Sequence, residues 1–226
     1  MKKLFLLIIV LISVAACAHL PEIHPASDTS GLSAESYCGA LFPVGRWQLY
    51  HAIQATVPGG RKSMLTGVTV LSSRDRSIDC ALMTPEGLVL FNGHYYKDTL
   101  TVDRAIPPFD RPGFAQGLMD DLMLLFFVPR APLCQLGQLD RLSRVCRFCS
   151  PDRTTDIVAK EDRNWEVRQY SGQNRLTRSL VASNVVHIAG GTFPERLTLR
   201  NHGMLGYQLK LKLLEAIPLN TESGKK

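Results

Sequence analysis

The chain has 226 residues, of which 45% are hydrophobic and 20% are charged, and its formal net charge is +6. This composition excludes a disordered chain, a collagen, a coiled coil and a membrane protein with several spans. The length fits one globular domain preceded by an export segment. The moderate charge and the lack of a recognition motif indicate that nucleic acid is not a partner.

The first residues have the organisation of a bacterial export signal. Lys2 and Lys3 precede an apolar run over 4–12, and small residues follow it up to Cys17. The run is shorter than the ~20 residues that a transmembrane helix needs. Residues 14–17 resemble the lipobox of bacterial lipoproteins, which implies cleavage before Cys17 and acylation of Cys17. The alternative is an ordinary signal peptide in which this cysteine occurs by chance.

We therefore predict a lipoprotein signal peptide over 1–16 and an acylated Cys17 that begins a tether over 17–40. Two or three acyl chains, at ~0.8 kcal/mol per buried CH₂, attach a protein firmly to a membrane. Within the tether, the pattern around 32–41 predicts a short entry helix.

Hydrophobic residues recur at every second position in much of the chain, which is typical of strands with one buried face. The predicted strands are 46–57, 62–72, 77–84, 87–92, 154–160, 165–170, 185–189, 195–200 and 207–214. Short connections, several of them rich in Gly, Pro or Asp, separate them, so we expect antiparallel pairing. On the first strand Leu49, His51 and Ile53 share a face, as Leu209 and Leu211 do on the last.

A helix is predicted over 113–128, where apolar residues follow a helical spacing up to Pro129. Its apolar stripe consists of Phe114, Leu118, Leu122, Leu125 and Phe126. The end of this helix has little polar surface, so we expect it to be buried in the core or to face a ligand. Asp120 and Asp121 are interpreted as part of a solvated helix face.

These elements predict a mainly β (α+β) fold, with a large curved antiparallel sheet or unclosed β-barrel wrapped around helices. The predicted domain spans 41–217, and a polar tail follows over 218–226.

Export places the cysteines in an oxidising compartment. Cys146 and Cys149 have the spacing of a zinc knuckle, but no second pair completes a site, and a turn signal follows them. We predict a disulfide among Cys134, Cys146 and Cys149, with metal binding or redox chemistry as the alternatives. Cys80 lies in an alternating run and is expected to be buried and unpaired.

No catalytic signature is found: the sequence lacks a GxSxG elbow, a P-loop, a dinucleotide-binding GxGxxG and an HExxH helix. We therefore predict no catalytic residue, no metal ligand and no cofactor. His51, on the apolar face of its strand, is interpreted as a core or cavity histidine rather than a general base.

Residues 42–51, 67–71 and 81–87 resemble a family of proteobacterial lipoproteins associated with aryl-polyene lipid biosynthesis loci. That family is grouped with the LolA/LolB-like lipoprotein carriers, and the resemblance covers roughly 38–215. It implies an unclosed β-barrel lidded by helices, around an apolar cavity that accepts acyl chains.

The resulting hypothesis is an envelope lipoprotein, held by its anchor at the periplasmic face of the outer membrane, that binds or accepts a lipid, an acyl chain or a lipoprotein for transfer. A periplasmic lipoprotein carrier is a candidate partner. The alternatives are a non-catalytic lipoprotein that scaffolds an envelope complex and an envelope hydrolase or transferase. The candidate cavity residues are Leu49, Ile53, Phe114, Leu118, Leu122, Leu125, Phe126, Leu209 and Leu211.

Overall fold

The computed structural model describes residues 20–25, 34–140, 142–160, 163–203 and 206–219. The predicted signal peptide, the candidate lipidation site Cys17 and most of the polar tail lie outside these residues. Within the described part of the chain, no helix combines the length and apolar character needed to cross a membrane.

The described residues form two helices and twelve strands. The helices are α2 (Ala34–Gly39) and α3 (Phe114–Phe126). The strands are β1 (Arg46–Thr56), β2 (Lys62–Ser72), β3 (Ser77–Met83), β4 (Val89–Tyr96), β5 (Thr99–Ala105), β6 (Leu133–Asp140), β7 (Ser143–Ser150), β8 (Arg153–Lys160), β9 (Trp165–Ser171), β10 (Leu176–Ile188), β11 (Gly191–Asn201) and β12 (Gln208–Pro218).

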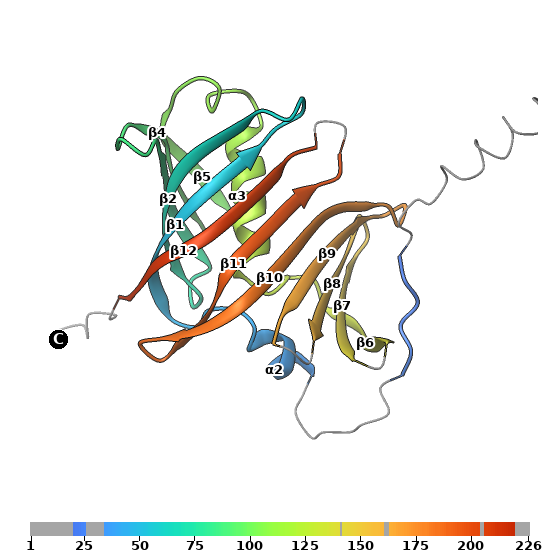
Figure 1. The fold of residues 1–226 in the computed structure, drawn as a ribbon. Coiled ribbons are helices and arrows are strands. Elements are labelled where there is room, and N and C mark those ends of the chain that lie inside the picture. The colour runs from blue at the N-terminus through green and yellow to red at the C-terminus, as the bar shows by residue number, and fades with distance from the viewer. Residues whose placement is uncertain (1–19, 26–33, 141, 161–162, 204–205, 220–226) are drawn as a thin grey trace, which may run out of the picture.

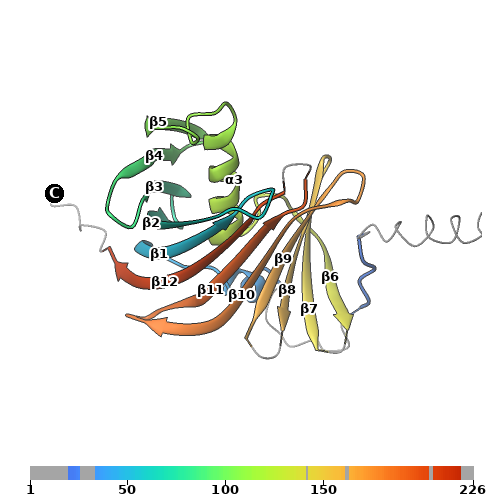
Figure 2. The same ribbon diagram turned by 45° about the horizontal axis from the view of Figure 1, so that its top comes forward.

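All twelve strands belong to one sheet, in the order β5-β4-β3-β2-β1-β12-β11-β10-β9-β8-β7-β6. Strands β1 to β5 form one antiparallel meander and β6 to β12 a second, and the pairing of β1 with β12 joins them. Helix α3 follows β5 at one edge and precedes β6 at the other, so the chain must cross from edge to edge. It does so through the hollow of the curved sheet, where α3 lies (Figure 1, Figure 2). The predicted fold class, an unclosed antiparallel sheet curved around a helix, is confirmed.

The core fills this hollow. Alternate residues of β1 turn inward, so that Trp47, Leu49 and Ile53 are buried. The buried side chains of α3 meet them from the other side. The β7–β9 half of the sheet is covered by α2 and the turn after it, where the ring of Phe42 lies 5.0 Å from that of Trp165.

Three strands, β5, β6 and β7, are not predicted from the sequence, and the reason differs between them. Strand β5 is an edge strand with mostly exposed side chains, so it shows no alternation. Strand β7 is buried on both faces from Val145 to Phe148, because α2 lies on one side and residues 20–25 lie on the other. A doubly covered strand loses the period of two by which strands are recognised.

Two disulfides join strands β6 and β7 to each other and to helix α2. Cys134 is bonded to Cys149 across the neighbouring strands β6 and β7, whereas Cys146 is bonded to Cys38 of α2. The sequence does not identify Cys38 as a partner, because 108 residues separate it from Cys146. Among the described cysteines Cys80 is free, and it is buried on β3.

Candidate functional site

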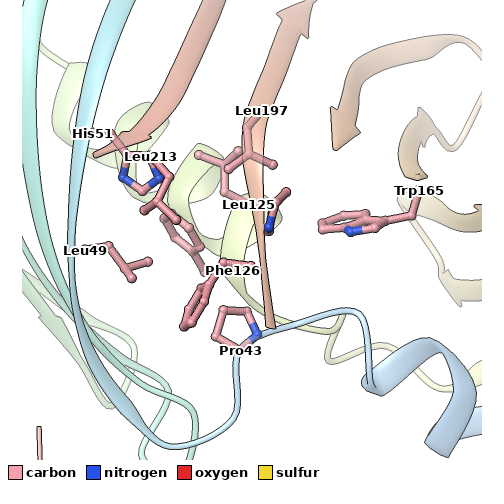
Figure 3. A pocket seen from close by; sticks show the side chains of 10 residues that line it. Pro43, Leu49, His51, Leu125, Phe126, Trp165, Leu197 and Leu213 are labelled. Carbon is pink, nitrogen blue, oxygen red and sulfur yellow. The ribbon is translucent and has the colours of Figure 1, made fainter. Parts of the chain in front are cut away.

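A small apolar pocket lies between α3 and the inner face of the sheet (Figure 3). Its lining comes from β1, β9, β11, β12, the end of α3 and the turn before β1. The lining residues are Pro43, Leu49, His51, Leu125, Phe126, Trp165, Phe193, Pro194, Leu197 and Leu213. The pocket volume is about 10 Å³, which is the space of one water molecule.

The open cavity that the sequence analysis expects is therefore not present in this conformation. Pockets that hold small molecules have volumes of ~300–1,000 Å³, and the side chains of α3 occupy the corresponding space here. Of the candidate cavity residues, Leu49, Leu125 and Phe126 line the pocket. The others pack elsewhere in the same core: Ile53, Phe114, Leu118, Leu122, Leu209 and Leu211.

His51 is the polar side chain of strand β1 that enters this apolar space. It is 3% exposed, and its ring centroid lies 5.9 Å from that of Phe126 (Figure 3). Burial lowers the pKa of His51 to about 4, because an apolar environment disfavours the charged imidazolium. The imidazole is therefore neutral at neutral pH.

Helix α3 is also fastened by a polar cluster beside its apolar stripe. The hydroxyl of Tyr207 donates to the Asp121 carboxylate, and Nε of Arg178 approaches Oδ1 of Asp121 to 3.0 Å. Nε of Arg178 and Oδ1 of Asp121 lack the alignment of a hydrogen bond, so their attraction is ionic. The cluster joins α3 to β10 and to the residue that precedes β12.

Asp121 is 3% exposed, which corrects the expectation that it lies on a solvated helix face. Desolvation raises the pKa of this carboxyl to about 6, although the Tyr207 hydrogen bond and the positive charge of Arg178 act in the opposite direction. Burial and the neighbouring carboxylate also raise the pKa of Tyr207 to about 12. The sequence gives no sign of this cluster, because 86 residues separate Asp121 from Tyr207.

The C-terminal end of α3 is held from the turn between β2 and β3. Arg76 donates from Nη1 to the carbonyl of Val128 at 3.0 Å, and its guanidinium lies 5.1 Å from the ring centroid of Phe127. A cation at a helix C-terminus interacts favourably with the helix dipole. Helix α3 and the residues that follow it are thus fixed to the sheet by apolar packing, by the contacts of Asp121 with Tyr207 and Arg178, and by Arg76.

A larger hollow, of about 890 Å³, lies on the outer side of the sheet and is open to solvent. Its lining includes Arg46 and Arg74, and the carboxylate of Asp79 is hydrogen-bonded to Nδ1 of His94 in it. Among the described residues, no three His, Cys, Asp or Glu side chains converge as metal ligands. The two hollows thus differ in character: the site at α3 is small and apolar, whereas the outer one is large and lined by charged side chains.

No protein-family model and no curated protein matches the chain. Its fold is similar to that of a LolA superfamily protein from Nitrosomonas europaea, with 13% identity, a TM-score of 0.48, and coverage of 81% of this chain and 90% of that one. A domain described as an outer membrane lipoprotein-sorting protein from Vibrio parahaemolyticus is 8% identical, with a TM-score of 0.48 over 80% of this chain and 87% of that one. None of these values is high enough to transfer a site residue or an activity to this chain.

Proposed function

We propose that this protein binds an acyl chain, of a lipid or of a lipoprotein, between helix α3 and the inner face of the sheet. Cys17 anchors it to the membrane, at the periplasmic face of the outer membrane, and the binding involves no covalent chemistry. The observation that supports this proposal is the apolar pocket at the end of α3, which is lined from both the helix and the sheet. Helix α3 is the movable wall, and a ligand enters as the helix lifts.

The free energy lost when α3 leaves the sheet and the free energy gained when an acyl chain is buried are of similar size. Helix α3 buries Met119, Leu122, Leu124, Leu125 and Phe126. At ~1.5–3 kcal/mol each, their exposure costs on the order of 10 kcal/mol. An acyl chain of about sixteen carbons gains about 12 kcal/mol on burial, at ~0.8 kcal/mol per CH₂. Contacts between helix and sheet are thus exchanged for contacts with the ligand with little net change in free energy, which suits a protein that must also release its cargo.

The second candidate is a non-catalytic scaffold whose core is filled by its own side chains. The pocket volume of about 10 Å³ favours it, because no acyl chain fits the present conformation. The two functions differ in one respect: a carrier takes up lipid when α3 lifts, whereas a scaffold does not.

Lipid uptake by the full chain, extracted from membranes in mild detergent, tests the proposal. A fluorescent fatty acid is titrated into wild type, Leu125→Asp and Leu142→Asp. Leu125 lines the pocket, whereas Leu142 is 63% exposed between β6 and β7 and is the matched control. We expect Leu125→Asp to weaken binding at least tenfold, because a charge is costly in an apolar site, and Leu142→Asp to bind like wild type. Folded wild type that neither takes up the fatty acid nor carries a lipid in native mass spectrometry contradicts the proposal.

A further inference from the structure

The imidazole of His51 lies in the pocket without a polar partner. Although the side chain is 3% exposed, no hydrogen bond from either ring nitrogen is found among the residues that the structure describes. The ring extends from β1 toward Phe126, into the apolar lining (Figure 3). Buried polar groups are almost always hydrogen-bonded, so each exception requires an explanation.

Packing alone does not require a histidine here. The other inward residues of β1 around it, Leu49 and Ile53, are aliphatic and fill the same layer of the core. An aliphatic or aromatic residue at position 51 would fill the space without the cost of desolvating an imidazole. The place of an imidazole without a hydrogen bond in this apolar lining points to a partner that arrives with a ligand.

The backbone beside His51 is also irregular. The pairing of β1 with β12 shifts between Tyr50 and His51, from Glu215 to Leu213, so that Leu214 is left without a partner on β1. Such a bulge changes the direction of neighbouring side chains, and bulges are frequent next to functional sites.

The indole of Trp165 lies on the other side of the pocket (Figure 3). It is 2% exposed, and it packs against the ring of Phe42 at a centroid distance of 5.0 Å. A neutral imidazole offers one N–H donor and one acceptor nitrogen, and an indole offers one donor. The pocket therefore presents the imidazole of His51 in apolar surroundings, which matches an apolar ligand that carries an oxygen acceptor.

We propose, on the basis of the lipid-binding function above, that His51 is a specificity-determining residue that donates a hydrogen bond to a carbonyl or carboxyl oxygen of the acyl ligand. The oxygen belongs either to a free fatty acid or to the acyl ester of a lipid. A hydrocarbon of the same length lacks the acceptor and leaves the imidazole unpaired, so the site discriminates between an acyl compound and an alkane.

The test compares dodecanoic acid, methyl dodecanoate and dodecane, each displacing the apolar dye N-phenyl-1-naphthylamine from the full chain. For each compound, the ratio of Kd between His51→Phe and wild type is measured, so that differences in aqueous solubility cancel. We expect His51→Phe to weaken the acid, the ester or both about tenfold, which is the effect of one hydrogen bond, and to change dodecane less than about twofold. Loss with the acid alone identifies a free carboxyl group, and loss with both identifies an ester carbonyl.

Equal weakening of all three compounds, or of none, overturns the role of His51 while leaving lipid binding intact. Failure of wild type to bind any of the three overturns the lipid-binding function itself. His187→Phe is the matched control, because His187 is exposed and hydrogen-bonded to Thr192.

A second measurement needs no variant of the pocket. In protein labelled with ¹⁵N-histidine, the ring resonances of His51 shift when the acid or ester is added and stay in place with dodecane. Unchanged resonances with all three compounds also overturn the proposal.

Discussion

Burial between the sheet and α3 makes the charged form of His51 unfavourable. Its pKa falls from 6.5 to about 4 on folding. Between these values the unfolded chain binds a proton that the folded protein does not, so acid favours unfolding. The contribution of His51 to the unfolding free energy is therefore fully present above pH 6.5, the pKa in the unfolded chain. It is lost as the pH falls toward about 4, the pKa in the folded protein.

We expect His51→Phe to remove this contribution. The difference in unfolding free energy between wild type and the variant should fall by about 2 kcal/mol from pH 7 to pH 5, since one pKa unit corresponds to ~1.4 kcal/mol. Urea unfolding at a series of pH values measures it, and other titrating groups cancel in the difference. A difference that is independent of pH would show that His51 is accessible to protons in the folded state.

The sequence locates His51 but not its chemical state. Alternation along β1 places it on the buried face with Leu49 and Ile53, as the structure has it. Whether a buried histidine has a partner depends on residues of α3 and β12, which local periodicity does not identify. Asp121 shows the same limit: its helical position suggests solvent, and its burial depends on Arg178 of a distant strand.

At the level of elements, α3 is held by two groups whose titrations act in opposite directions. Lifting the helix would expose Asp121, whose pKa is about 6 in the closed state and whose ordinary value is 3.8. The closed state therefore binds the proton more tightly, and acid favours closure through Asp121. Exposure of His51 has the opposite sign, because its pKa rises on opening, so acid favours opening through His51.

Asp121→Asn should remove one of these opposing effects. Because the two pKa values of Asp121 differ by about two units, closure gains about tenfold through this carboxyl between pH 7 and pH 5. We therefore expect the ratio of the opening constant of α3 in Asp121→Asn to that in wild type to increase about tenfold as the pH falls from 7 to 5. Hydrogen-exchange protection of the α3 amides, corrected for intrinsic rates, measures it.

Asp103→Asn is the matched control, because Asp103 is exposed on β5 and its carboxylate accepts a hydrogen bond from Asn92, away from the Arg178 cluster. The same pH dependence in Asp121→Asn and wild type would contradict a role for Asp121 in holding the helix.

Elements with one covered face are those that the sequence predicts. Strands β1, β2 and β12 keep their alternation because α3 covers one face and the other is more open to solvent. The spacing in 113–128 likewise predicts α3 within two residues at each end. Of the strands it misses, β5 is mostly exposed, whereas the other two, β6 and β7, pack against distant segments. These segments are α2, which the Cys38–Cys146 bond joins to β7, and residues 20–25, which lie along β6.

At the level of the whole molecule, residues 20–25 form a strap against the β6 edge of the sheet. His24 exchanges two backbone hydrogen bonds with Gln138, at 2.9 and 2.8 Å. Ile23 is buried against Val145 and Val158. Beside it, the buried ion pair of Arg147 with Asp156 is completed by a hydrogen bond from Nη2 of Arg147 to the carbonyl of Pro21. The strap thus covers one edge of the sheet and fixes the start of the domain.

This arrangement bears on how the domain is attached to the membrane. Cys17 precedes Pro21 by four residues, and four residues span at most ~14 Å. If Cys17 carries the anchor, the β6 edge is the part of the sheet nearest to the membrane. With such an anchor, the strap would define the orientation of the domain, and its release would lengthen the segment between the anchor and the sheet.

Gly137 is the residue on which the strap depends. A Cβ at this position would lie 2.1 Å from the carbonyl oxygen of His24 and 2.5 Å from Cγ2 of Ile23. Since backbone blocks the space, Gly137→Ala should displace the strap, expose Ile23 and lower the unfolding free energy by about 2 kcal/mol. Hydrogen exchange at the His24 amide, which donates to Gln138, should accelerate at the same time. Gly39→Ala, where a Cβ meets nothing within 4 Å, is the control and should leave the His24 amide protected. Unchanged protection in Gly137→Ala would mean that the strap shifts along β6 without detaching, and that the orientation of the domain does not depend on this contact.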